Sequence, residues 1–202
     1  KMLRHEVGLI QERLDNEENA HRKFFSFANT VTTINYQKTF LGHGWVGIMF
    51  QAQPGQEYSE IVLHVKFKEN DATLQQETLG NLGVNLVYGA FHLYDNPRRL
   101  IKSLYDDISV DKIEIDMIDF QGPAFPYVDN RLMSLQLIKN SMTEVVIFNS
   151  EGKNMLPADL LYRKDVFAVR GSFRPVTLVN VDMFENGLKM FLNETEGNPE
   201  DT

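Results

Sequence analysis

The sequence predicts an α/β fold that leans towards α+β, with helices flanking a mixed sheet. An antiparallel three-strand meander comes first and parallel β-α-β units follow it. Three observations predict this class. Residues alternate between apolar and polar in the first third of the chain, helical spacing dominates residues 71–105, and strand and helix patterns then take turns up to residue 192. We expect one domain over residues 1–193 and an acidic tail or truncated linker over residues 194–202.

The N-terminal third begins with an amphipathic helix and continues with three strands. Leu3, Val7, Ile10 and Leu14 recur at the spacing of one helix face. Apolar and polar residues then alternate within residues 25–33, 45–51 and 61–67, which is typical of strands. Because the segments that connect these strands are short, we expect them to pair as an antiparallel meander.

The rest of the chain predicts helices separated by strands. Residues 71–94 have helical spacing with Asp71 as the N-cap, and a shorter helix follows over residues 96–105. Further strands are expected at residues 112–120, 144–149 and 165–170, and further helices at residues 130–139, 157–162 and 181–192. Strands connected through helices favour right-handed crossovers, so we expect these strands to pair in parallel.

Composition excludes several classes of function. The 202 residues hold no Cys, which removes thiolate catalysis, Cys-ligated zinc, iron–sulfur clusters and disulfides. With 20 Lys and Arg against 28 Asp and Glu, the net charge is −8, which weighs against a nucleic-acid partner. No signal peptide and no apolar stretch of about 20 residues is present, so we expect a cytoplasmic protein without a membrane partner. No pattern identifies a cofactor, and no histidine spacing predicts a metal site.

The predicted parallel strands place a candidate anion site at their carboxyl ends, where α/β sheets bind ligands. The loop after residues 165–170 offers two guanidinium groups and free backbone donors, which suit a phosphate or carboxylate. The residues expected to bind the anion are Arg131, Arg170, Gly171, Ser172 and Arg174. The alternative is that these arginines pair with acids of the same domain, such as Asp129, Asp165 or Asp182.

Acidic residues along the strand at residues 112–120 are candidates for acid/base work. Asp116 shares a face with Glu114, and Asp119 lies at the strand end, where it could face a ligand. Mutual repulsion would raise their pKa values, as general acids and bases require. His43, beside the only tryptophan, is a third candidate, and His64 lies on a polar strand face. The alternative for the acids is that residues 112–120 form an edge strand whose polar face is simply solvated.

Seven separated blocks, in order, resemble a little-characterised bacterial family. They are the blocks at residues 43–47, 60–65, 79–86, 113–118, 122–125, 128–132 and 170–177. The resemblance covers about residues 1–193 and implies that the chain is an internal domain of a longer protein. Members of the family are often labelled nicotinate-nucleotide adenylyltransferase. The block at His43 lacks the histidine pair of such enzymes, so no catalytic residue is carried over from the label.

Two functions therefore stand as expectations. The first is an enzyme domain that binds a small anionic metabolite, either a nucleotide or a phosphorylated compound, with Asp116, Asp119 and His43 as catalytic candidates. The second is a non-catalytic assembly domain of a larger protein, which the fourteen Phe residues favour because aromatic side chains can cover an interface. In either case we expect contacts with the rest of a longer chain or with further copies of this one.

Overall fold

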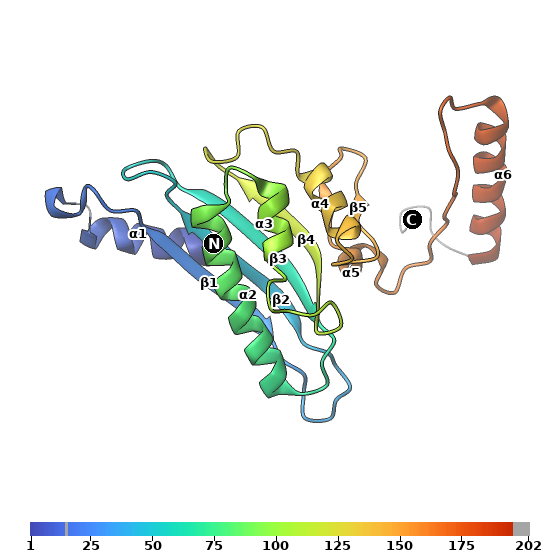
Figure 1. The fold of residues 1–202 in the computed structure, drawn as a ribbon. Coiled ribbons are helices and arrows are strands. Elements are labelled where there is room, and N and C mark those ends of the chain that lie inside the picture. The colour runs from blue at the N-terminus through green and yellow to red at the C-terminus, as the bar shows by residue number, and fades with distance from the viewer. Residues whose placement is uncertain (15, 196–202) are drawn as a thin grey trace. The chain divides into compact units, whose positions relative to one another are not determined.

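The computed structural model describes residues 1–14 and 16–195 (Figure 1). The chain divides into two compact units, Lys1–Leu156 and Pro157–Thr202, and each is described here by itself. The final helix extends to Thr195, so the expected acidic tail lies outside the described residues from residue 196 onwards.

A four-stranded antiparallel sheet forms the centre of the first unit. Its strands are β1 (Phe25–Thr32), β2 (His43–Phe50), β3 (Ser59–Phe67) and β4 (Ile113–Gln121), and their order in the sheet is the order in the chain. Each strand pairs antiparallel with its neighbour. The predicted meander of the first three strands is confirmed, because the alternating pattern and the short connections both fit hairpins.

Four α-helices and a small hairpin accompany the sheet. The helices are α1 (Met2–Leu14), α2 (Ala72–His92), α3 (Pro97–Ser103) and α4 (Asn130–Lys139), with the 3-10 helix η1 (Glu17–Asn19) after α1. The hairpin consists of β5 (Ile147–Phe148) and β6 (Asn154–Met155). The Asp71 side chain accepts hydrogen bonds from the backbone N–H groups of Thr73 and Leu74, which confirms it as the N-cap of α2.

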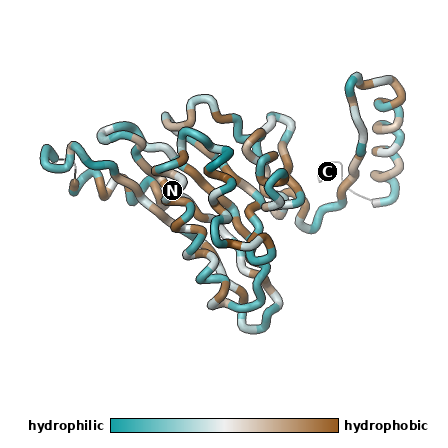
Figure 2. Tube along the Cα trace, viewed as in Figure 1, coloured by the Kyte–Doolittle hydropathy of each residue, from teal (hydrophilic) through white to brown (hydrophobic). Residues whose placement is uncertain are grey.

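The apolar side chains of the sheet and of α2, α3 and α4 form one core. Alternate residues of β2, β3 and β4 point to this face. Figure 2 shows brown, hydrophobic segments in both the strands and the helices. The central members are Ile48, Phe50, Ile61, Leu63, Val65, Leu82, Leu86, Leu100, Ile113, Ile115, Ile118 and Leu137. This face of the sheet therefore forms the hydrophobic core of the first unit.

The opposite face of the sheet is covered only in part, by α1. Leu3 and Val7 are its buried residues, and Arg4 forms an ion pair with Glu60 at 3.7 Å. Helix and sheet approach closely at Gly47, where an added Cβ would lie 2.8 Å from a methyl group of Leu3. The part of this face that carries the ring of His43 stays exposed.

The prediction of parallel β-α-β units is wrong. The chain leaves β3 at Phe67 and re-enters the sheet beside it at Ile113, because two helices, α2 and α3, lie between these strands. One helix returns the chain to the start of a strand, whereas two antiparallel helices bring it back to the same end. The strand expected at residues 144–149 is reduced to Ile147–Phe148, which pairs with β6, and residues 165–170 form no strand.

The second unit contains α5 (Pro157–Leu161) and α6 (Leu178–Thr195). Phe167 packs on α6, with ring centroids 5.7 Å from those of Phe184 and Phe191, and its ring approaches Gly187. Within the described ranges of both units, no helix has a stretch long and apolar enough to cross a bilayer.

Candidate functional site

A β-bulge in β4 places the Asp116 carboxyl on the open face of the sheet. His64 lies opposite Met117 and Val65 lies opposite Ile115, so Asp116 is an extra residue without a partner in the register. Strict alternation from Ile118 would turn Asp116 towards the core. The bulge lets Ile115 and Ile118 both stay in the core while Asp116 turns to the face of His64.

Asp116 joins His64 and Lys66 through its two carboxylate oxygens. Its Oδ1 lies 2.6 Å from Nδ1 of His64, and its Oδ2 lies 2.6 Å from Nζ of Lys66. Both partners belong to β3 and are two residues apart, so they point to the same face. The side chains of Asp116 and His64 are 0% and 2% exposed, whereas that of Lys66 is 34% exposed. The lysine therefore connects a buried acid to the surface.

The Asp116 carboxyl is ionised at neutral pH. Burial, the largest influence, raises its pKa, but the hydrogen bonds and charges of His64 and Lys66 together outweigh burial, so the pKa lies below its usual range. This direction is opposite to the rise expected from repulsion between neighbouring acids. The physical reason is that the neighbours of the Asp116 carboxyl are His64 and Lys66 on β3, which donate hydrogen bonds to it, and not other acids.

An ionised Asp116 fixes the tautomer of His64. A carboxylate only accepts hydrogen bonds, so Nδ1 carries the proton and donates it to Asp116. In the neutral ring Nε2 is then the acceptor, and no described residue donates a hydrogen bond to it. The ring centroids of Trp45 and His43 lie 5.0 and 5.6 Å from that of His64. The rings of two exposed residues therefore flank the buried His64 on the open face of the sheet.

Asp119 belongs to a second polar cluster on the same strand. Its carboxylate accepts hydrogen bonds from Asn130 Nδ2 at 2.6 Å and from Gln121 Nε2 at 2.5 Å. Asn130 also bonds both backbone groups of Phe120, so it holds the start of α4 against the end of β4. Asp119 therefore helps to hold the end of β4 and the start of α4 together.

Arg131 lines the same pocket as Asp119, as their places beside one strand end suggest. The pocket has a volume of about 400 Å³ and also contains Gly152 and Lys153. However, Arg131 donates from Nε and from a terminal nitrogen to the two oxygens of Asp129, at 3.0 and 2.7 Å. This bidentate pair lowers the pKa of Asp129 to about 2. The alternative that these arginines pair with the domain's own acids holds for Arg131.

The remaining anion-binding candidates lie in the second unit. Arg170, Gly171, Ser172 and Arg174 are exposed and follow no strand, so the strand-end crevice that motivated their choice does not form. That crevice required parallel strands, and every strand pair among the described residues is antiparallel. The structure thus brings His43 and Asp116 together around His64, and Asp119 and Arg131 together in a neighbouring pocket.

Lys66 was not among the candidate site residues, and His64 was noted beside His43 without a place in the predicted site. Their alternation on β3 marks them as residues of one polar face, and this signal is visible in the sequence. Their contact with Asp116 depends on a one-residue bulge, which alternation cannot reveal. Among the described residues, no group of three or more His, Asp and Glu side chains is placed to hold a metal ion.

No protein-family model matches the chain, and neither the curated proteins nor the solved structures compared with it show a significant similarity. The arrangement of the side chains is therefore the basis for inferring function.

Proposed function

We propose that the open face of the sheet binds a small anionic metabolite and exchanges a proton with it through His64. One observation supports this proposal: the buried carboxylate of Asp116 contacts both His64 and Lys66 at 2.6 Å. Burying such a group costs several kcal/mol of desolvation, and apolar residues of similar volume would often serve stability as well. A buried and perturbed acid on an open face is characteristic of functional sites.

His64 is the proton-transfer group in this proposal. The His64 side chain is only 2% exposed, so the bound molecule must displace the rings of Trp45 and His43 to reach it. Nε2 then accepts a proton from an O–H or N–H group of that molecule, and the Asp116 carboxylate at Nδ1 stabilises the resulting imidazolium. Asp116 keeps its negative charge throughout and acts as a positioning residue. This division of roles follows the general logic of an acid that orients a histidine base.

Lys66 is the cation best placed to attract the anion. Its side chain is partly exposed, and its ammonium lies on the carboxylate that orients His64. His43 extends the same surface, since its ring lies beside that of His64. Arg131 is less suited, because it lines a separate pocket that does not contain His64, and Asp129 holds its guanidinium at two points. Nucleotides and phosphorylated metabolites of the cytoplasm are therefore the ligands to test.

The only tryptophan provides the experiment. Trp45 contacts His64, so its fluorescence reports on ligands and charge changes at this site. We expect saturable changes on titration with at least one of inorganic phosphate, pyrophosphate, AMP, ATP or ribose 5-phosphate. Lys66→Met should weaken that response at least tenfold. Lys102→Met, which removes an exposed cation from α3, should leave it unchanged.

The role of His64 is tested separately by NMR of the imidazole nitrogens. The neutral ring should carry its proton on Nδ1, and Asp116→Asn should change the tautomer balance. Absence of any fluorescence response across the ligand panel, together with equal tautomer populations in the two proteins, would contradict the proposal.

A non-catalytic assembly role is the second candidate. The observation that favours it is an apolar groove between β1 and α2, on the opposite side of the sheet from His64.

A further inference from the structure

We infer that a second copy of this chain covers the groove between β1 and α2, forming a two-fold dimer through the free edge of β1. Three observations lead to this inference: an unpaired strand edge, an apolar groove beside it, and the lack of charge on both. The inference stands apart from the proton-transfer proposal, because its residues and its measurement are different.

The free edge belongs to β1. This strand is the first in the sheet order and pairs with β2 alone among the described strands. Pro, Lys and other charged residues usually protect an edge strand from pairing with another chain. The sequence of β1 contains none of them. An unprotected edge of eight residues is a template for another strand.

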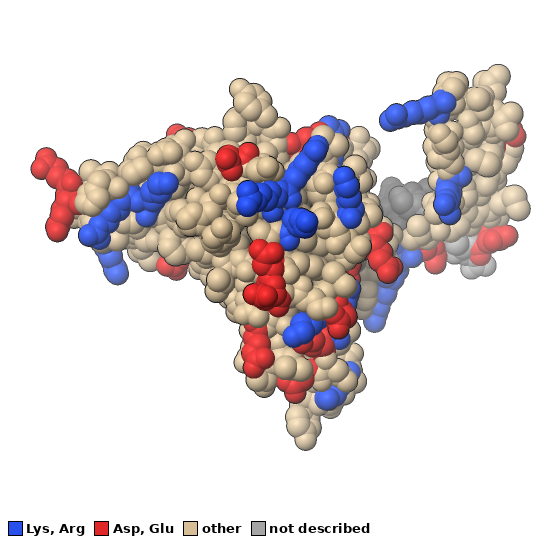
Figure 3. Space-filling model, viewed as in Figure 1, with Lys and Arg blue, Asp and Glu red and all other residues tan. Residues whose placement is uncertain are grey.

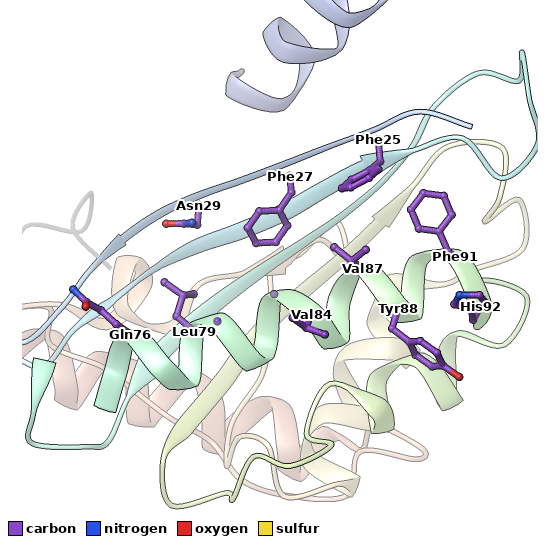
Figure 4. A pocket seen from close by; sticks show the side chains of 12 residues that line it. Phe25, Phe27, Asn29, Gln76, Leu79, Val84, Val87, Tyr88, Phe91 and His92 are labelled. Atoms are coloured by element: carbon purple, nitrogen blue, oxygen red, sulfur yellow. The ribbon is translucent and has the colours of Figure 1, made fainter. Parts of the chain in front are cut away.

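The groove lies beside this edge, between β1 and α2 (Figure 4). It has a volume of about 800 Å³. Figure 4 shows the rings of Phe25 and Phe27 pointing from β1 towards α2, where Phe91 and Val84 extend from the helix. Phe25 is 43% exposed and Val84 is 69% exposed, so the groove walls are open to solvent. Exposed apolar patches of this kind mark interaction surfaces.

The groove contains no Lys, Arg, Asp or Glu, and α2 has one charged residue, Glu77, in its 21 positions. By contrast, Lys and Arg side chains gather over α3 in Figure 3. A chain of net charge −8 repels its own copies at long range. At this groove two copies meet without opposing like charges.

Geometry makes the edge and groove complementary to themselves. Antiparallel pairing of β1 with the β1 of a second copy is symmetric about a two-fold axis. With the axis perpendicular to the sheet, the two α2 helices lie on one face of a continuous eight-stranded sheet and face each other across the axis. Gly80 has no atom within 4 Å of its Cβ position, and Gly83 carries only the Phe27 ring. Such small residues let helices approach closely.

The mass of the chain in solution tests the inference, by size exclusion with light scattering. Wild-type protein should show twice the mass of one chain. Val84→Arg and Gly80→Arg should each give the mass of one chain. Gly80→Arg should also keep the fold, because the site is open and glycine disfavours helix. The matched control is Val110→Arg, an exposed valine outside the groove, which should remain dimeric.

The absence of native cysteine allows a direct test of the strand pairing. Single cysteines at Ala28, Asn29, Thr30 and Val31 should form an intermolecular disulfide at the one or two positions nearest the axis. Ser109→Cys should form none. A wild-type monomer at concentrations up to about 1 mM would overturn the inference. So would a Gly80→Arg dimer, or a monomer whose groove binds an apolar dye.

Discussion

The two faces of the four-stranded sheet follow opposite rules. On the face towards α2, α3 and α4, alternate residues such as Leu63 and Val65 are fully buried and apolar. On the other face, the intervening residues His64 and Lys66 meet Asp116 in a buried polar network. The first face needs only volume and hydrophobicity, whereas the second depends on the position of single atoms. One extra residue in β4, Asp116, allows both faces to be satisfied: the isoleucines of the strand stay in the apolar core, while the carboxylate reaches the polar face.

The largest expected effect comes from deleting one residue of β4. Removal of Asp116 leaves a strand whose remaining residues alternate regularly, with Ile113, Ile115 and Ile118 still facing the core. Removal of Ile115 instead turns Asp116 towards the core, where an unpaired carboxylate is strongly destabilising. We expect the first deletion to fold and the second to be unfolded, as measured by circular dichroism and urea titration. Two equally folded deletion variants would refute the assignment of Asp116 to the bulge.

A smaller effect separates neighbouring residues of β3. Leu63→Ala leaves a cavity in the core and should lower the free energy of unfolding by about 2–5 kcal/mol. Val62→Ala, on the partly covered face, should cost about 1 kcal/mol or less. Urea denaturation with an unchanged m-value checks both numbers. Comparable losses in the two variants would mean that the faces are equally packed.

The loss of stability at acid pH should depend on Asp116. Its pKa in the folded protein lies below its value near 3.9 in the unfolded chain. The ionised carboxylate therefore stabilises the fold fully above pH of about 4, and this contribution is lost as the pH falls through the folded pKa. Asp116→Asn should be less stable at pH 7, and the difference should shrink at low pH. Thermal unfolding between pH 2 and 7 measures it, with Asp95→Asn as the control.

The smallest effect concerns the helix that covers the apolar face. Asp71→Ala removes an N-cap that accepts two backbone hydrogen bonds, at 2.8 and 3.0 Å, and should cost about 1 kcal/mol. Asp71→Asn should recover most of this loss, because the amide oxygen can also accept. A loss of the same size in both variants would show that charge, rather than capping, stabilises the start of α2.

Local patterns predicted the elements more reliably than their pairing. The helix at residues 130–139 and the cap at Asp71 follow from contacts within a few residues, and both are confirmed. The direction of β4 does not, because it depends on the end of the sheet to which the two helices α2 and α3 return the chain. The same limit applies to the site. Asp116 was recognisable as a polar residue on a strand and His43 as a polar residue in the turn before one, while their connection through His64 is a contact between distant segments.

The sequence by itself determined the four strands of the main sheet and the long helices, because periodicity of 2.0 and 3.6 residues is a local property of the backbone. Only the tertiary structure decided that β4 runs antiparallel to β3 and that Asp116 is the extra residue between them. It also decided that the groove beside β1 stays open. These outcomes depend on how distant segments share space, and a one-residue shift changes which face every side chain occupies.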